Sequence, residues 1–399
     1  MIENLKNRLR RIREAGNSAR QNKAQYDALT ETETPAEVSY NSPSAVDWPG
    51  WEEAGFKTLK RKLYLELNSP LPSLFPSALA ILIPDFRRAG RIPAPDELVF
   101  FDLETTGLSG GAGTIAFLAA VGRFAFQDRI EITQYLLLDY PGESVFIEAV
   151  VKELCAPPSA RADSEANSAG GDQRCPFIVS YNGKCFDSQI LKNRCLMNGI
   201  RNPEYFHADL LHPARRLWKR KLPDCSQATI ETSVLGLDRA GDTPGALAPE
   251  IWFSFLRSGE NRELLSICAH NAKDIYGLAA LFLAFARIAG EPLESGRRYL
   301  YDEETLALIW QRAVKKESFF FGSEKAAGLV ETGNALLEEA ARKGGGRAAH
   351  ALAIKAEWQL KDPVLALAYT KTAIADPDIS EGMRTVLEKR RDRLLAKIP

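Results

Sequence analysis

Three apolar segments follow one another between residues 97 and 138 and predict strands of a β-sheet. Their ranges are 97–103, 114–125 and 129–138, and short turns or glycine-rich loops join them. Alternating or unbroken apolar runs bounded by turn residues are typical of half-buried or fully buried strands. Because the connections are short, the three strands are expected to form an antiparallel meander.

Helical patterns alternate with one more strand after residue 142. A helix is predicted near 143–154, a strand over 177–181 and a helix over about 187–198, and further helices over 210–220, 226–235, 248–257 and 261–288. This order predicts an α/β fold with a mixed sheet flanked by helices.

From about residue 302 the pattern is helical throughout. The expected helices are 302–315, 324–342, 347–360, 363–375 and 380–396. Trp358, Leu360, Pro363 and Ala366 are similar to one helix-turn-helix of a tetratricopeptide (TPR) unit, but no clear second copy follows at the expected period. A TPR-like tail and a simple helical cap both stay open.

Three regions are therefore expected: a basic N-terminal arm and linker over 1–50, an α/β domain over 51–295 and an all-α helical domain over 296–399. In the arm, apolar residues at helical spacing alternate with arginines, which favours either docking on the body of the protein or contact with phosphates. Residues 156–175 are rich in Pro, Ser, Ala, Gly and Asp and are expected to form a surface insertion.

Composition and charge narrow the class of protein. The chain has 399 residues and a net charge of -1, so no overall positive field attracts nucleic acid. Its six cysteines are scattered without a Cys-x-x-Cys pair, which argues against a disulfide framework or a thiolate zinc site and fits a reducing cytoplasm. No apolar run is long enough to span a bilayer, so no membrane association is expected.

The most informative segment is 98–107, where an apolar strand ends in two carboxylates one residue apart. Strand side chains alternate between faces, so Asp102 and Glu104 point the same way while Leu103 points to the other face. Two anions on one face of a buried strand need a cation, hydrogen-bond donors or water. A divalent metal ion meets that need and makes phosphoryl chemistry possible.

Two further motifs carry acidic residues. Asp187 ends the sequence Tyr-Asn-Gly-Lys-Cys-Phe-Asp at a predicted helix start, where an aspartate is also a favoured N-cap. His270 and Asp274 are four residues apart on one face of a predicted helix, a spacing that is also typical of a solvated pair. In the functional interpretation, Asp274 completes a metal site and His270 orients or deprotonates water.

The order Asp-x-Glu, Asn-x-x-x-Phe-Asp and His-x-x-x-Asp resembles the DEDD superfamily of 3′–5′ exonucleases, and the middle motif is similar to that of family B polymerase proofreading domains. A narrower resemblance, to the bacterial YprB-type RNase H-like family, covers most of residues 50–290. It rests on the residues 101–118, 181–187, 209–218 and 235–237. The resemblance implies an RNase H-like mixed sheet, a metal-dependent nuclease and, often, a helical repeat-like tail.

The resemblance further implies two Mg²⁺ or Mn²⁺ ions held by Asp102, Glu104, Asp187 and Asp274. Asp102 would bridge both ions, and Asp187 would reach the ion that faces the leaving oxygen. Glu104 and Asp274 would complete the ion that binds the attacking water. Oxygen ligands favour these hard cations over zinc. Superfamily members usually have Tyr four residues, or His five residues, before the last Asp, so the role of His270 as a general base stays open.

Substrate contacts are expected beside the acidic motifs. Thr105, Thr106 and Gly107 follow the first acidic pair, where related enzymes press backbone against the terminal nucleotide, and Asn182 lies in the second motif. For Asn182 the alternative is a purely structural turn residue.

A basic segment over 210–221 is a second expected contact. Arg215, Arg216 and Lys219 surround Trp218 in this segment. Basic side chains contact phosphates and an aromatic face stacks on a base, which predicts nucleic-acid binding here. The alternative is a solvated helix face with Trp218 in the core.

The predicted activity is metal-dependent hydrolysis of phosphodiester bonds, in the form of a 3′–5′ exonuclease that trims single-stranded RNA or DNA. Two alternatives stay open: a nucleic-acid-binding module that cleaves poorly, and an interaction protein whose helical tail binds a protein partner. The presence of all four carboxylates argues against a degenerate, inactive relative.

Overall fold

The structure, a computed structural model, describes residues 48–107, 113–125, 128–157, 175–316 and 323–398. All of them belong to the unit Pro43–Pro399. The predicted arm and linker over 1–50 lies almost entirely outside these ranges, and so does most of the predicted insertion over 156–175.

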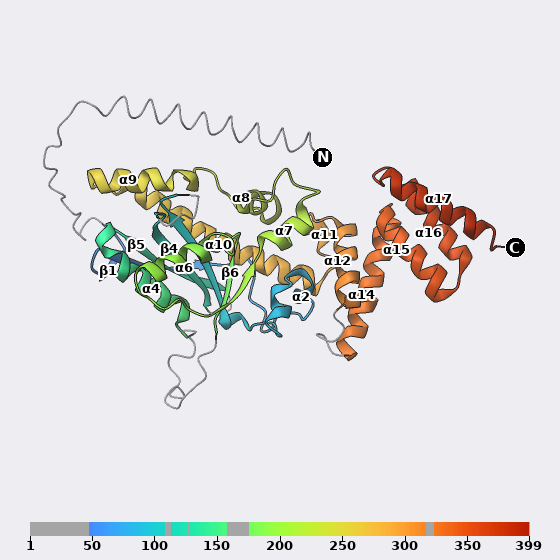
Figure 1. The fold of residues 1–399 in the computed structure, drawn as a ribbon, viewed down its shortest axis with the longest axis horizontal. Coiled ribbons are helices and arrows are strands. Elements are labelled where there is room, and N and C mark those ends of the chain that lie inside the picture. Colours follow the sequence, from blue (N-terminus) through green and yellow to red (C-terminus); the bar gives the residue numbers. More distant parts are fainter. Residues whose placement is uncertain (1–47, 108–112, 126–127, 158–174, 317–322, 399) are drawn as a thin grey trace, which may run out of the picture. The chain divides into compact units, whose positions relative to one another are not determined.

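A mixed sheet of seven strands forms the framework of the α/β region (Figure 1), with the order β1-β2-β5-β4-β3-β6-β7. The neighbouring pairs β1–β2, β2–β5, β5–β4 and β4–β3 are antiparallel. Strand β6 is parallel to β3, and β7 is parallel to β6. The predicted meander is confirmed as β3, β4 and β5. The strand bounds are β1 Glu52–Gly55, β2 Thr58–Glu66, β3 Leu98–Thr105, β4 Ala116–Ala125, β5 Arg129–Leu137, β6 Phe177–Ser180 and β7 Phe206–Asp209.

The two edge strands, β1 and β7, are absent from the sequence-based prediction. Each spans four residues, which is too short to display the alternation that identifies a strand. β7 nevertheless matters for the site, because its last residue is Asp209.

Helices cover both faces of the sheet (Figure 1). On β3, Leu98 and Phe100 lie in an apolar cluster with α2 (Leu79–Leu82) and α10 (Arg262–Gly290). The alternate residues Val99, Phe101 and Leu103 lie in a second cluster with α4 (Glu143–Cys155), α6 (Asp187–Met197) and α9 (Ala248–Ser258). Asp102 and Glu104 continue the face of Phe100, so both carboxylates project toward α10.

Short helical segments connect these larger elements. They are α3 Asp85–Arg88, η2 Pro95–Glu97, η3 Tyr140–Gly142, α7 Leu211–Trp218, α8 Gln227–Ile230, η5 Glu231–Leu235, η6 Gly245–Leu247 and α11 Gly296–Tyr299. The mixed α/β sheet with flanking helices is the predicted fold class.

The C-terminal region is helical, as predicted. Its elements are α12 Glu303–Lys316, α14 Ser323–Arg342, α15 Gly346–Lys355, η7 Ala356–Leu360, α16 Pro363–Ala375 and α17 Glu381–Leu395, and successive helices contact one another. The turn before α16 explains one helix start: Asp362 accepts a hydrogen bond from the Leu365 backbone N–H at 2.9 Å, and Pro363 fits the first helical position. The likeness to a TPR unit and a protein partner for this region stay predictions.

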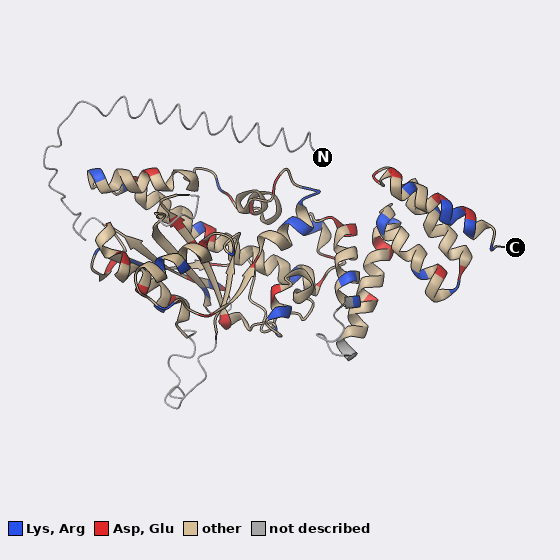
Figure 2. Cartoon of the chain, viewed as in Figure 1, with Lys and Arg blue, Asp and Glu red and all other residues tan. Residues whose placement is uncertain are grey.

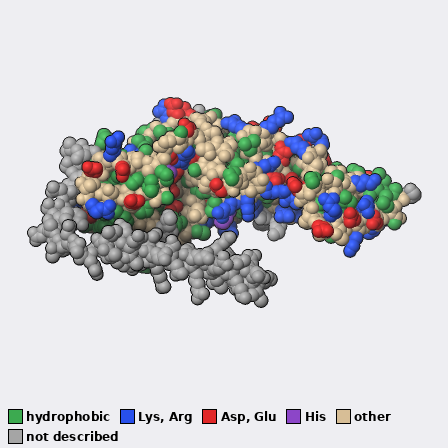
Figure 3. All heavy atoms as spheres, turned by 90° about the horizontal axis from the view of Figure 1, so that it is seen from above, with side chains coloured by type: hydrophobic (Ala, Val, Ile, Leu, Met, Phe, Trp, Pro, Cys, Tyr) green, Lys and Arg blue, Asp and Glu red, His purple; other side chains and the backbone are tan. Residues whose placement is uncertain are grey.

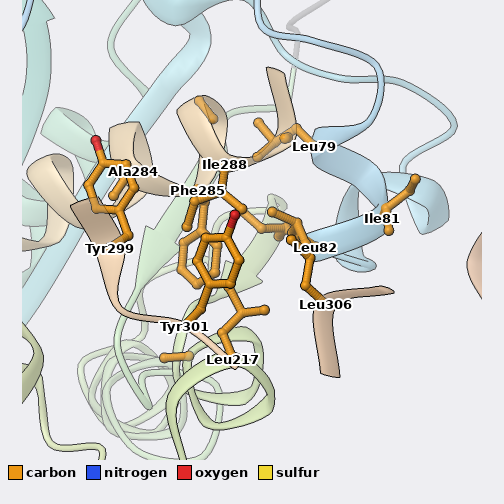
Figure 4. Packing of buried hydrophobic residues seen from close by; sticks show 14 of the residues in the cluster. Leu79, Ile81, Leu82, Leu217, Ala284, Phe285, Ile288, Tyr299, Tyr301 and Leu306 are labelled. Carbon is orange, nitrogen blue, oxygen red and sulfur yellow. The ribbon is translucent and has the colours of Figure 1, made fainter. Parts of the chain in front are cut away.

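The apolar core continues from the sheet into these helices (Figure 4). Leu306 and Trp310 of α12 share one buried cluster with Leu82 of α2 and Phe285 of α10. The boundary at residue 295/296 stays a prediction, but a cut there would expose apolar side chains from both sides.

Charges of both signs are intermixed on the face drawn in Figure 3, with no single-sign field over it. This agrees with the net charge of -1 for the whole sequence. Across the ranges that the structure describes, no helix combines the length and the apolarity needed for a membrane span.

Candidate metal centre

Side chains from β3 and α10 meet near the carboxyl end of β3. Glu104, His270 and Asp274 each present an oxygen or nitrogen able to bind a metal, and these three atoms lie within 4.8 Å of one another. Glu104 faces α10 because it shares a strand face with Phe100, whose ring packs against Phe282 of that helix at 5.9 Å. The structure therefore brings three of the predicted site residues together.

Asp102 lies on the same face of β3 and is electrostatically coupled to the group. Burial raises its pKa well above the usual aspartate value, and the charges of Asp187, Asp274 and Glu104 raise it further. Burial and the charges of Asp274 and Asp187 raise the pKa of Glu104 to about 8. The neighbouring carboxylates therefore disfavour the charged forms of Asp102 and Glu104, and a bound cation would reverse that effect.

A chain of buried hydrogen bonds holds Asp102 in place. Its Oδ2 accepts from Asn271 Nδ2 at 2.7 Å, and Asn271 Oδ1 accepts from Gln134 Nε2 at 2.8 Å. Gln134 also donates to the Cys268 carbonyl at 2.8 Å and accepts from Arg61 Nε at 2.6 Å. Since Asn271 and Gln134 are fully buried, the amide groups leave the Asp102 carboxylate little freedom to rotate.

The Arg239 guanidinium donates hydrogen bonds to Asp274 and to two further carboxylates. Its Nη2 donates to Asp274 Oδ1, its Nε to Glu231 Oε2 at 2.5 Å, and its Nη1 to Asp242 Oδ2 at 2.6 Å. Glu231 is fully buried, and its side chain approaches Gly277 of α10 so closely that a Cβ at this glycine would overlap it. The guanidinium therefore anchors the loop before η6 to the face of α10 that carries Asp274.

His270 is held between two carboxylates. Its Nδ1 lies 2.9 Å from Asp242 Oδ2, and its Nε2 lies 3.2 Å from Asp274 Oδ2. Asp242 also accepts from Arg239 and pairs with Lys273 Nζ at 3.4 Å. An ionised Asp242 favours the ring form with the proton on Nδ1, which leaves Nε2 as an acceptor.

Asp187 reaches the site from the turn between β6 and α6. Asp209 at the end of β7 organises this turn, because its carboxylate accepts from the backbone N–H groups of Asn182 at 2.8 Å and Lys184 at 3.1 Å. Gly183 packs against Asp187, where an added Cβ would lie only 2.9 Å from Oδ2. Asp187 is buried, and burial together with the charge of Asp209 raises its pKa to about 7.

Asn182 has a left-handed backbone with φ +66°. Asparagine tolerates this conformation better than most residues, which gives Asn182 a structural reason for its position. Its predicted contact with substrate stays a prediction.

Thr105, Thr106 and Gly107 form the start of the turn after β3. The Thr105 hydroxyl donates to the Gly107 carbonyl at 3.0 Å, and the Thr106 hydroxyl accepts from the Ile115 backbone N–H at 3.0 Å. Both hydroxyls therefore stabilise the turn itself. The predicted nucleotide contact of this segment stays a prediction.

Basic residues lie on the segment around α7 (blue in Figure 2), and the side chains of this segment divide between the surface and the core. Arg215 and Lys219 are exposed, whereas Arg216 is half-buried and donates to the Ile81 carbonyl at 3.3 Å. Trp218 is fully buried against Phe285, with ring centroids 5.3 Å apart. The prediction that Trp218 stacks on a base is therefore wrong, because its indole lies in the apolar core and its Nε1 donates to the Tyr299 carbonyl at 2.7 Å.

Several residues of the site are absent from the sequence-based prediction. Asn271 lies inside the His-x-x-x-Asp motif, and its position next to His270 is the one local signal for it. Asp209 begins the segment 209–218 on which the resemblance rests, but no role is predicted for it. The others, Gln134, Arg239 and Asp242, lie outside the motif segments. For these no local pattern signals a role.

The donor set fits a divalent cation. Carboxylate oxygens suit Mg²⁺, Ca²⁺ and Mn²⁺, and an imidazole nitrogen adds affinity for first-row transition ions. The residues that would hold such ions are Asp102, Glu104, Asp187, His270 and Asp274. The repulsion among the carboxylates is the physical reason to expect a bound cation here.

Sequence comparison relates part of this chain to known proteins. Residues 99–285 match the RNase H superfamily model. Over 197 residues the chain is 36% identical to the uncharacterized protein YprB of Bacillus subtilis, and the match covers 48% of this chain and 42% of that protein. The chain thus spans less than half the length of this relative.

Among solved structures, one similar chain is the family B DNA polymerase of the archaeon Pyrobaculum calidifontis. The identity is 12%, the TM-score is 0.33, and the match covers 54% of this chain and 29% of the polymerase.

Proposed function

Because residues 99–285 carry an RNase H superfamily domain, we propose that this protein is a metal-dependent nuclease that hydrolyses phosphodiester bonds. The observation that carries the proposal is the convergence of four carboxylates from β3, α6 and α10, close enough to raise the pKa of Asp102 and Glu104. Such a cluster destabilises the metal-free protein, which favours a functional reason for its presence.

The four carboxylates would together coordinate two ions, Mg²⁺ or Mn²⁺. Asp102 would be the shared ligand, Glu104 and Asp274 would hold one ion, and Asp187 would hold the other. Bound divalent ions supply charge stabilisation at the phosphate and lower the pKa of an attacking water. Asn271 fixes the rotation of the Asp102 carboxylate, so the ligands are oriented before an ion arrives.

The substrate we infer is single-stranded nucleic acid entering by its 3′ end, either RNA or DNA. The motif order similar to 3′–5′ exonucleases supports this direction. Exposed Arg215 on α7 and exposed Lys219 directly after it support contact with phosphates. The turn over Thr105, Thr106 and Gly107 supports close approach of backbone to a terminal nucleotide.

The test uses RNA and DNA oligomers labelled at the 5′ end, incubated with Mn²⁺ or Mg²⁺. We expect products that shorten one nucleotide at a time, and no turnover by Asp274→Ala. A 3′-phosphate or a double-stranded 3′ end should slow the reaction. Internal cleavage products would contradict the exonuclease assignment, and equal turnover by Asp274→Ala would contradict the site.

A further inference from the structure

We propose that His270 is a metal ligand in this centre, with Asp242 fixing its ring, and that the centre therefore prefers Mn²⁺ or another first-row transition ion to Mg²⁺. The inference rests on the proposed metal-dependent function and specifies one of its ligands. It replaces the general-base role as the assignment of His270.

The ligand atoms of β3 and α10 are grouped closely enough to share one ion. Glu104, His270 and Asp274 each direct one ligand atom into a space where all three lie within 4.8 Å of one another. Ligands bound about 2.1 Å from one ion lie within about 4.2 Å of each other. A contraction of a few tenths of an ångström is therefore enough for all three to bind one ion.

The His270 ring is oriented by a carboxylate on its other nitrogen. Asp242 Oδ2 faces His270 Nδ1 at 2.9 Å, and Arg239 and Lys273 stand against the same carboxylate. Arg239 and Lys273 hold this carboxylate beside Nδ1, so the orientation of the ring is fixed. A carboxylate that holds one ring nitrogen of a metal-binding histidine is a recurrent arrangement, because it orients the other nitrogen and makes it more basic.

The free nitrogen of His270 faces another acceptor. With its proton on Nδ1, His270 directs the Nε2 lone pair at Asp274 Oδ2, 3.2 Å away. Asp274 is an acceptor as well, so the two atoms repel unless a proton or a metal ion lies between them. A metal ion bound by Nε2 and Oδ2 satisfies both atoms at once.

A glycine borders the space beside the ring. Gly245 of η6 covers this side of the site, and a Cβ added to it would lie 3.0 Å from His270 Nε2 and 4.0 Å from Glu104 Oε1. Any larger residue would occupy volume next to the two ligand atoms. Glycine leaves that volume open for an ion and its water.

An imidazole ligand changes which ion the centre prefers. Nitrogen donors bind first-row transition ions increasingly well along the series that starts at Mn²⁺, whereas Mg²⁺ favours oxygen ligands and retains its waters. A site with one imidazole and several carboxylates therefore distinguishes Mn²⁺ from Mg²⁺ more strongly than a site with carboxylates alone.

The test measures binding directly and needs no turnover. Free Mn²⁺ is titrated with the full-length protein by electron paramagnetic resonance, and Mg²⁺ affinity is obtained by competition. We expect His270→Gln and Asp242→Ala to weaken Mn²⁺ binding about 10- to 100-fold, with a smaller change for Mg²⁺. His212→Gln, at an exposed position of α7, is the matched control and should bind like the wild type.

Two further measurements distinguish the loss of a ligand from a folding defect. Pulsed electron paramagnetic resonance should detect a ligating nitrogen nucleus on the bound Mn²⁺ in the wild type and not in His270→Gln. Gly245→Ala keeps every ligand, and it should still weaken Mn²⁺ binding because its methyl fills the space beside Nε2. Circular dichroism should show the same metal-free fold for all variants.

The outcomes separate this inference from the function on which it rests. If the wild type binds Mn²⁺ but His270→Gln binds it equally well and no nitrogen signal is present, His270 is not a ligand and only this inference fails. If the wild type binds neither Mn²⁺ nor Mg²⁺, the metal-dependent function itself fails.

Discussion

The two sides of the acidic site are built in different ways. On the β3–α10 side, Asp102 is held by Asn271 and Gln134, side chains from segments far apart in sequence. On the β6–α6 side, Asp187 is carried by one short turn whose backbone N–H groups bind Asp209. The first side depends on hydrogen bonds between side chains, and the second depends on one side chain, Asp209, that binds the backbone N–H groups of a turn. Ligands of one centre can therefore differ in how much of the fold they need.

Asp102→Asn tests the shared carboxylate and should have the largest effect. Loss of a ligand that both ions share should remove several kcal/mol of transition-state stabilisation, which is roughly a 10³-fold loss of cleavage or more. The melting temperature without metal should rise, since one of the repelling charges is gone. Single-turnover assays measure the cleavage rate, and calorimetry measures the melting temperature. Asp378→Asn, exposed in the tail, is the control, and retained metal-dependent turnover by Asp102→Asn would refute the site.

Asn271→Ala tests the tertiary side of the comparison. It removes the donor to Asp102 and the acceptor of Gln134, so cleavage should fall about 10- to 100-fold. The free energy of unfolding should fall by roughly 1–3 kcal/mol, because two buried polar groups lose a partner. Chemical denaturation and metal titration measure the two effects. Asn198→Ala, which removes only a hydrogen bond to the Arg194 carbonyl, is the comparison variant, and an equal loss of cleavage there would remove the special role of Asn271.

The pH dependence of metal binding reports on the coupled carboxylates. Without metal the pKa of Glu104 is about 8 and that of Asp187 about 7, so near neutral pH each binds a proton that metal must displace. Metal affinity should rise with pH up to about 8, by about tenfold per pH unit for each proton released. Calorimetry in buffers of different ionisation enthalpy counts these protons, and binding without proton release would contradict the coupling.

The same pKa values determine whether the metal-free protein becomes more or less stable as the pH changes. An acid with a raised pKa binds more protons in the folded than in the unfolded state, so lowering the pH favours folding. The metal-free protein should therefore become more stable as the pH falls from about 9 to about 6, and saturating metal should abolish that trend. A melting temperature that falls over this range without metal would contradict it.

Asp209→Asn tests the side on which a carboxylate binds the backbone of the turn before Asp187. The amide places an NH₂ group where one carboxylate oxygen now accepts a backbone N–H, so the turn should be destabilised by roughly 1–3 kcal/mol. Cleavage should fall less than in Asn271→Ala, because the remaining amide oxygen still accepts from the turn. Denaturation curves and initial rates give the comparison, and a larger loss of cleavage than in Asn271→Ala would reverse the ranking of the two sides.

Arg215→Gln with Lys219→Gln should have the smallest effect, since these exposed residues lie outside the acidic site. Affinity for single strands should fall, and the slope of log affinity against log salt should decrease by about 1 for each phosphate that the variant no longer neutralises. Fluorescence anisotropy at several salt concentrations measures it. Lys371→Gln with Lys389→Gln, at exposed tail positions, is the matched pair, and an unchanged slope in the α7 variant would leave that segment without a role in binding.

Local patterns predict the parts of this molecule that depend on neighbouring residues. The apolar runs of β3, β4 and β5 are contiguous, and the alternation of β3 predicts which face carries Asp102 and Glu104. The helices of the C-terminal region are likewise predicted by their periodicity. These features need no knowledge of the distant chain.

Other features depend on residues that are distant in sequence. The pattern around Trp218 permits either an exposed or a buried ring, and the packing of Phe285 and the Tyr299 carbonyl decides it. In sequence, Gln134 resembles any polar residue of a strand, and only its contact with Asn271 of α10 gives it a role. Such pairings arise from tertiary packing and leave no local pattern.

The hydrogen bond between Gln134 and Asn271 joins residues 137 positions apart, which has a consequence for biosynthesis. A nascent chain that has left the ribosome only as far as Asp187 carries three of the acidic ligands but neither the amide that orients Asp102 nor Asp274. During translation, Asp274 therefore becomes available together with α10, the helix that packs on the sheet. The growing polypeptide cannot assemble the acidic site before α10 emerges.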